Sequence, residues 1–150
     1  MRRLKFRNAV WMAAMLCFVL NLKSEPMHLD TLAGLRDRSR VLLVFAPSSE
    51  DVRMEKQLHR LRDHAAEATE RDLVTIALPA AGAAASERRM DAVEAAAVRR
   101  QFRVEDSDFL VVLVGKDGGE KLRSSKVLSF EQLRAVIDAM PMRQQEMRKP

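Results

Sequence analysis

The sequence predicts an α/β fold in which helices cover both faces of a mixed central sheet. Short, continuous apolar runs rich in β-branched residues are typical of central strands. The stretches between them repeat apolar residues every three or four positions, which is typical of amphipathic helices. A glycine-containing turn near the C-terminus indicates that the last two strands form a hairpin. The elements follow in the order strand, helix, strand, helix, strand, strand, helix.

The N-terminus has the pattern of an export signal. Residues 1–7 contain four basic side chains and no acidic one, and residues 9–20 are an unbroken apolar run that Asn21 interrupts. A membrane-spanning helix needs about 20 residues, so a signal peptide over residues 1–24 is the favoured interpretation. Because no Ala-x-Ala site follows, an uncleaved anchor stays open. We therefore expect an exported protein, periplasmic or secreted, or held at the inner membrane by this segment alone.

Removal of the export segment would change the chemistry of the chain. Cys17 is the only cysteine, so residues 25–150 have no thiol. Five of the 26 Lys and Arg residues and none of the 21 acidic residues precede Glu25, which leaves a net charge of zero. A neutral domain has no overall field to attract a phosphate backbone, and we expect no nucleic-acid partner. About 125 residues are enough for one domain.

The first strand follows a polar lead-in over residues 25–39. Residues 41–46 are continuously apolar, which predicts a central strand that Pro47 ends. It opens a domain that we expect to span residues 40–140. A short basic tail over residues 141–150 follows that domain.

An amphipathic helix is expected after the first strand, over residues 49–69. Ser48 or Ser49 is the expected N-cap, since a serine hydroxyl accepts a hydrogen bond from a first-turn N–H group. Apolar residues at alternating spacings of four and three form its inner face: Met54, Leu58, Leu61, Ala65 and Ala68.

The second strand is expected over residues 73–78, closed by Pro79, and a small-residue linker over 80–85 follows. Ser86 is then expected to cap a helix that ends near residue 103. Strands separated by a helix are expected to be parallel. The inner positions of this second helix are Val93, Ala97, Val98 and Phe102.

The third strand is expected over residues 109–114. Residues 115–120 form a turn in which glycines allow positive φ, and residues 121–128 return as an edge strand. Ser129 is expected to cap the last helix, which Pro141 stops. Its inner positions are Phe130, Leu133, Val136, Ile137 and Met140.

This order, with Ala-Pro-Ser-Ser after the first strand and Gly-Lys-Asp-Gly after the third, resembles a thioredoxin-like domain. It is more closely similar to the uncharacterised DUDES-type family of small exported bacterial proteins, which are related to domains of secreted sushi-repeat and equarin-type matrix proteins. The matching stretches are residues 40–47, 112–118 and 130–143. The resemblance implies a thioredoxin-like three-layer sandwich and no established activity.

Two departures from redox-active thioredoxins are visible. Residues 47–50 (Pro-Ser-Ser-Glu) stand where that resemblance places paired cysteines, at a helix N-terminus that stabilises a thiolate. Residues 105–108 (Glu-Asp-Ser-Asp) stand where it places a cis-proline. We therefore expect no catalytic residues of the thioredoxin type.

Other candidate chemistry is thin. His59 and His64 are five positions apart, about 140° around a helix, so they cannot share a metal ion. The acidic residues 105–108 lack the ligand number and the glycine of an EF-hand loop. We expect neither metal nor cofactor. The second helix is basic through Arg88, Arg89, Arg99, Arg100 and Arg103. These arginines form either a patch for an acidic partner or anionic lipid, or a salt-bridged solvated face.

These observations predict a non-catalytic binding or interaction module of the cell envelope, with an envelope protein or small ligand as partner. The alternative is a thiol-independent or redox-accessory enzyme that uses the thioredoxin-type groove. In either case, the predicted binding surface is a pair of loops containing Pro47, Ser48, Ser49, Asp106, Ser107 and Asp108.

Overall fold

The computed structural model describes residues 30–82 and 90–148. A four-stranded sheet has the order β2-β1-β3-β4, where β1 is Arg40–Ser48, β2 Leu73–Ala81, β3 Leu110–Val114 and β4 Glu120–Ser124. β1 pairs with β2 in parallel and with β3 antiparallel, and β3 forms the expected hairpin with β4. The mixed α/β sandwich is therefore confirmed. The expected signal segment and the Ser86 cap lie outside the described residues.

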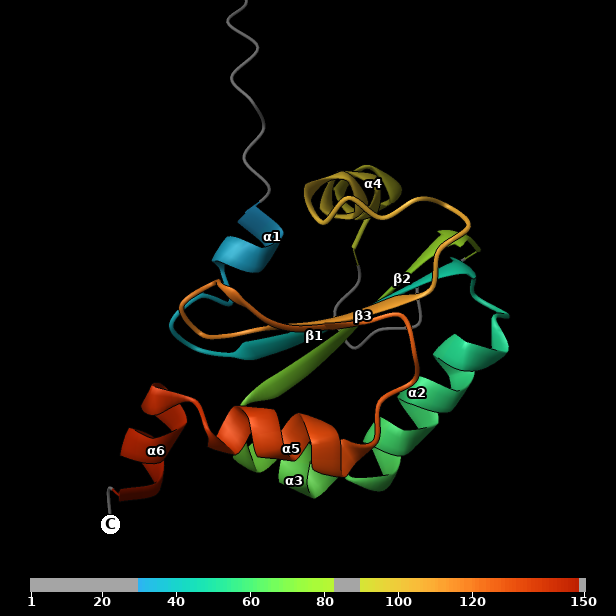
Figure 1. Cartoon of the computed structure of the whole chain (residues 1–150). Helices are drawn as coiled ribbons and strands as arrows, with labels where there is room; N and C mark the ends of the chain where they lie inside the picture. Colours follow the sequence, from blue (N-terminus) through green and yellow to red (C-terminus); the bar gives the residue numbers. More distant parts are fainter. Residues whose placement is uncertain (1–29, 83–89, 149–150) are drawn as a thin grey trace, which may run out of the picture.

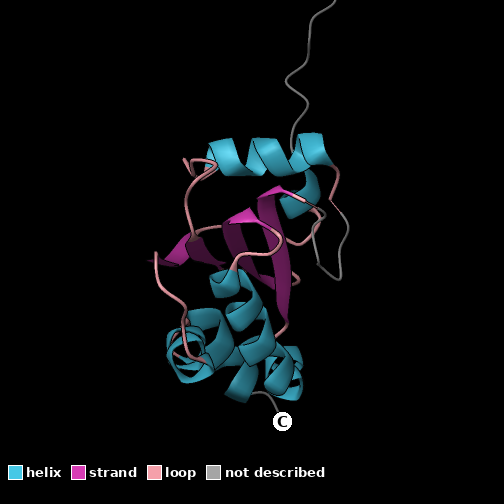
Figure 2. Cartoon of the chain, turned by 90° about the vertical axis from the view of Figure 1, so that its right-hand side faces the viewer, coloured by secondary structure: helices cyan, strands magenta, loops and turns pink. Residues whose placement is uncertain are grey.

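Helices lie on both faces of the sheet (Figures 1 and 2). One face carries α1 (Asp30–Ala33) and α4 (Ala92–Gln101). The other carries α2 (Val52–Asp63), α3 (Ala65–Glu70) and α5 (Phe130–Asp138), and α6 (Pro141–Arg148) follows at the C-terminal end. No helix within these two described stretches is long and apolar enough to cross a membrane.

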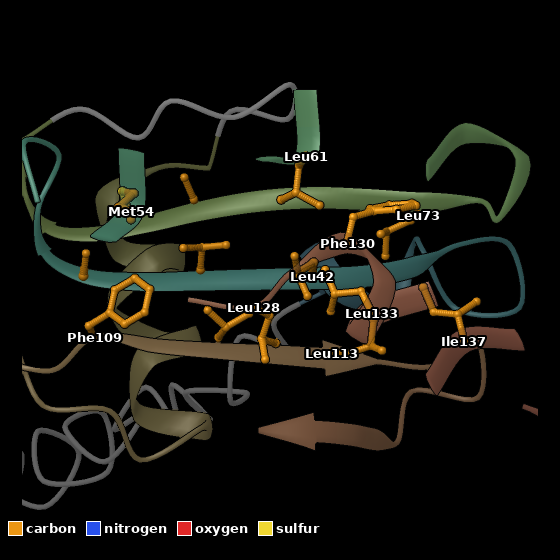
Figure 3. Close-up of a cluster of buried hydrophobic side chains, with 14 of the residues drawn as sticks. Leu42, Met54, Leu61, Leu73, Phe109, Leu113, Leu128, Phe130, Leu133 and Ile137 are labelled. Carbon is orange, nitrogen blue, oxygen red and sulfur yellow. The ribbon is translucent and has the colours of Figure 1, made fainter. Parts of the chain in front are cut away.

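The alternation of side chains along β1 divides the core into two layers. Leu42 and Val44 belong to the layer that packs against α2 and α5. Figure 3 shows Leu42 among the side chains of Met54, Leu61, Phe130 and Leu133. Leu43 and Phe45 face the layer under α4, together with Ile76, Leu78 and Val98. Because both faces of β1 are buried, its sequence is continuously apolar.

Both proline boundaries of the predicted strands were wrong. β1 continues through Pro47, and β2 through Pro79. Proline is tolerated on an edge strand because no ladder hydrogen bond is lost there. β2 is an edge strand, and the pairing of β1 with β3 ends at Phe45, so Pro47 lies where β1 has one neighbour only.

The expected parallel direction of the third strand was also wrong. α4 ends near the carboxyl ends of β1 and β2, where the Arg99 side chain contacts Ala46 and Leu78. The chain therefore enters β3 at that same end of the sheet. β3 runs back along β1, starting from the pair Phe45 and Leu110.

Three helix predictions needed correction. The helix expected over 49–69 is two helices, α2 and α3, which meet at His64, whose φ of −118° is not helical. α4 begins later than expected, at Ala92, and its N-cap Asp91 forms a capping box with Glu94. Val98 is buried as predicted, but Val93 is 63% exposed. The expected tail contains a helix, α6, with Pro141 at its first position, where proline needs no N–H partner.

Candidate functional site

The centre of the candidate site is Arg99, in the last turn of α4. Its side chain is buried, with 5% of the residue exposed. Nη1 donates to the carbonyl oxygens of Ala46 (3.3 Å) and Leu78 (2.8 Å), and Nη2 donates to that of Glu105 (2.5 Å). One guanidinium thus joins the carboxyl ends of β1 and β2 to the loop that precedes β3.

The charge of Arg99 is held in a poorly hydrated position. Its Nε has no hydrogen-bond partner and lies 3.5 Å from Oδ1 of Asp106, an exposed carboxylate. Burial lowers the pKa of Arg99, and the charges of Asp106 and Asp108 act in the opposite direction. An arginine stays protonated at neutral pH, so a positive charge is fixed at this end of the sheet. The Phe45 ring lies 5.7 Å from the guanidinium carbon and adds a cation–π contact.

In the predicted loop after β1, Ser48 and Ser49 contact the end of β2. Ser48 is the last residue of the strand and is paired with Ala81. The Ser49 N–H donates to the Ala81 carbonyl at 3.0 Å. A Cβ at position 82 would meet the Ser49 hydroxyl, so the Ser49 side chain would have to move, and the φ of Gly82 is +91°. Glycine is therefore favoured at position 82, above all by the backbone conformation.

Neither serine caps α2, contrary to the sequence prediction. Asp51 is the N-cap, and its Oδ1 accepts from the backbone N–H of Arg53 at 2.8 Å. The Arg53 guanidinium returns to the same carboxylate at 3.0 and 2.6 Å. The hydrogen bond from the Arg53 side chain is the main reason that the pKa of Asp51 lies below its ordinary value. A carboxylate thus occupies the helix N-terminus, where a thioredoxin-type site stabilises an anion.

The second predicted loop is a tight turn on the same end of the sheet. The N–H of Asp108 donates to the Glu105 carbonyl at 3.0 Å, and Oδ2 of Asp108 accepts from the Glu105 N–H at 3.1 Å. Asp106 and Ser107 are exposed. Arg53 lies over the ring of Phe109, 4.9 Å from its centre. The two predicted loops therefore lie at one end of the sheet, joined through Arg99 and Arg53.

A cleft of about 1230 Å³ opens beside these loops, between the end of β2 and α4. Small residues form much of its wall, including Ala80 and Gly82 after the buried part of β2 and Ala92, Ala95 and Ala96 on α4. Arg99, Arg100, Arg103, Glu105 and Asp106 line the same cleft, with Asp91 at the start of α4. Among the predicted site residues, Asp106 borders the cleft, whereas Pro47, Ser48 and Ser49 do not.

The sequence prediction missed the role of Arg99. It placed this residue with Arg100 and Arg103 on an outer face, because the inner face was assigned from apolar residues alone. Two features of the sequence could have indicated this role. Arg99 directly follows Val98, which is buried, and it lies seven positions after Ala92, on a side of α4 where the other side chains are small. A long side chain there reaches the strand ends.

His59 and His64 each have a ring nitrogen close to a carboxylate three or four positions further along the chain. Nδ1 of His59 lies 2.9 Å from Asp63, and Nδ1 of His64 lies 2.9 Å from Glu67. The ring of His64 also stacks on Phe130, with 4.6 Å between ring centres. Across residues 30–82 and 90–148, no group of three or more His, Cys, Asp or Glu side chains is placed to hold a metal ion.

Comparison with known proteins gives a family and a fold. The family described as "Domain of unknown function (DUF4174)" matches residues 31–146. No curated protein shows significant similarity. The structure of the reduced 2-Cys peroxiredoxin of Plasmodium vivax is similar, with a TM-score of 0.56 and 14% identity over 77% of this chain and 84% of that one. A structure titled as a malarial protein has a TM-score of 0.47 and 14% identity, over 67% of this chain and 94% of that one.

Proposed function

The chain belongs to the DUF4174 family of domains of unknown function, and we propose that it is a non-catalytic binding module of the cell envelope. The binding site is the cleft between the end of β2 and α4. The observation that carries the proposal is the position of this cleft at the carboxyl end of β2, with Arg99 of its wall bonded to the end of β1 as well. Ligands of open α/β sheets bind at the carboxyl ends of the strands.

Hydrogen bonds from Arg99 hold one part of the cleft wall in place, which favours binding. The Arg99 guanidinium holds the two strand ends and the Glu105 carbonyl together, so the Glu105–Asp108 turn has a defined position beside the opening. A largely pre-formed pocket loses little conformational entropy when its ligand binds. The N-terminus of α2, in contrast, is closed by Asp51 and Arg53.

The envelope location rests on the export pattern of residues 1–24 and on the resemblance to the DUDES-type exported family, and both belong to the proposal. The protein is periplasmic or secreted, or anchored at the inner membrane if the segment is retained. Its thioredoxin-like fold is shared with a peroxiredoxin. The similarity to the peroxiredoxin concerns the fold alone. The described residues contain no thiol, which is the reactive group of a 2-Cys peroxiredoxin.

The test is affinity capture with the full-length protein from an envelope extract of the producing organism. Ala80→Trp fills the cleft, and Ala66→Trp places the same bulk on the exposed surface of α3, across the sheet. We expect a partner that wild type and Ala66→Trp retain and Ala80→Trp loses. Equal retention by all three proteins, or retention of nothing, overturns the proposal. Turnover above buffer rates in disulfide-reductase, peroxidase or esterase assays would support the enzyme alternative.

A further inference from the structure

The end of the cleft near the C-terminus of α4 carries two exposed arginines. Arg100 and Arg103 both line it, three positions apart. Within residues 30–82 and 90–148, neither guanidinium is paired with a carboxylate. The four buried arginines of these stretches are all paired, Arg40 with Glu146, Arg71 with Asp138, Arg99 with Asp106 and Arg143 with Glu70. Two cations at the mouth of a cleft are thus available to a ligand.

The backbone at Arg103 gives a second, independent observation. Its φ is +54°, at the position where a Schellman motif ends a helix. The Val104 N–H donates to the Arg99 carbonyl at 3.0 Å, and the Arg103 N–H donates to the Arg100 carbonyl at 3.1 Å. Glycine is the usual residue at this position because other side chains are strained there.

The other described non-glycine residues with positive φ are Asp37 and Asp72. Aspartate visits this conformation because its short polar side chain bonds locally, and arginine has no such property. An exposed arginine at a position that favours glycine, beside a cleft, points to a use for that side chain.

We infer that the cleft binds an extended acidic peptide segment of a partner protein, with carboxylates held by Arg100 and Arg103. This inference rests on the proposed function and names the partner chemistry of the same site. Guanidinium groups bind carboxylates through paired, charge-assisted hydrogen bonds.

The size and lining of the cleft favour a peptide. Its volume of about 1230 Å³ exceeds the usual range for small-molecule sites, about 300–1000 Å³. The alanine wall of α4 offers a shallow surface for a main chain. Glu105 and Asp106 line the same end, and Asp91 lines the cleft at the start of α4, so three carboxylates limit its positive charge. The site therefore favours a segment with one or two carboxylates over a polyanion.

The experiment is fluorescence anisotropy of the full chain with a labelled hexapeptide of four Ala and two Glu, the two Glu at alternate positions, at low salt. The matched peptide has Gln in place of Glu. We expect the Glu peptide to bind and the Gln peptide to bind about tenfold more weakly or not at all. Arg100→Gln and Arg103→Gly should each weaken the Glu peptide about tenfold. Arg62→Gln, an exposed arginine on α2, is the matched control and should change nothing.

Arg103→Gly separates binding from folding, because glycine relieves the backbone at that position. Equal affinity for the Glu and Gln peptides, or unchanged binding in both cleft variants, overturns the inference. Inorganic phosphate that competes as well as the Glu peptide also overturns it, in favour of a small-anion site. If Ala80→Trp loses the envelope partner while the Glu peptide neither binds nor competes, the proposed function stands and the acidic-peptide inference fails.

Discussion

Arg40, the first residue of β1, is paired with Glu146 of α6, with Nη2 3.1 Å from Oε2 across 106 residues of sequence. Lys116, after β3, lies 2.7 Å from the other oxygen of the same carboxylate. Arg143 of α6 pairs in addition with Asp138 and Glu70. These contacts attach α6 to the sheet, so it is an integral part of the domain.

Replacement of Glu146 should destabilise the fold strongly. Arg40 is 1% exposed, and Glu146→Ala leaves its charge buried without a carboxylate. We expect a loss of about 3 kcal/mol in the free energy of unfolding, because removal of one partner of a buried pair strands the other. Urea denaturation measures this value. Gln145→Ala, an exposed neighbour on α6, is the control and should change stability by under about 0.5 kcal/mol. Similar values for both variants would show that α6 docks without the ion pair.

The same network makes stability depend on acid pH. Burial alone would raise the pKa of Glu146, but the hydrogen bond from Lys116, with the charge and hydrogen bond of Arg40, outweighs burial and lowers it. The pKa of Asp138 is lowered likewise, by Arg71 and Arg143 against burial. A carboxylate with a lower pKa in the folded state contributes stability above its unfolded pKa, and that stability is lost as pH falls through the folded value.

We therefore expect stability to be retained at neutral pH and to fall below about pH 5. Glu146→Gln should flatten this fall, since its carboxylate no longer titrates, whereas Gln145→Ala should leave it unchanged. Free energies of unfolding measured between neutral and strongly acid pH test the point. A variant curve parallel to that of wild type would remove Glu146 from the acid dependence.

The strands could be predicted from sequence because burial on both faces leaves a local mark. The sequence is apolar without interruption over residues 41–46 and 109–114. The strands expected there differ from β1 and β3 by at most two residues at either end. The role of α6 left no such mark. Its residues are mostly polar, and the partners of Arg143 and Glu146 lie far away in sequence. Periodicity within a segment carries no information on distant charge pairs.

Substitution of Arg103 and Arg100 by glycine should have opposite effects on stability. Arg103 has a φ of +54°, which costs a non-glycine residue about 1 kcal/mol or more. Arg103→Gly should therefore raise the free energy of unfolding by about 1 kcal/mol. Arg100 lies within α4, where glycine lowers stability by about 1 kcal/mol. Thermal and urea denaturation of the two variants measure the signs. A stability loss in Arg103→Gly would mean that its side chain makes structural contacts that outweigh the backbone strain.

Arg99→Met should destabilise the site although it removes a buried charge. Replacement of a buried ion pair by an apolar side chain can be neutral when both partners disappear. Here the acceptors of Arg99 are the carbonyl groups of Ala46, Leu78 and Glu105, which remain buried or partly buried after the substitution. Unpaired buried polar groups cost about 1–3 kcal/mol each, and partial access to water reduces the total. We expect a loss of about 3 kcal/mol.

Arg99→Lys tests whether geometry or charge is required. Lysine keeps the charge, but all its N–H donors are on one nitrogen. The planar guanidinium of Arg99 has two nitrogens that bond the Leu78 carbonyl at the strand end and the Glu105 carbonyl in the loop at the same time. An intermediate loss is therefore expected. Hydrogen exchange should locate the effect, with faster exchange at the Glu105–Asp108 turn in both Arg99 variants. Arg100→Met, on the exposed neighbour, should leave that turn protected. If Arg99→Met had the stability and the hydrogen exchange of the wild type, the strand ends and the loop would hold their positions without this guanidinium. Another interaction would then have to hold the wall of the cleft in place.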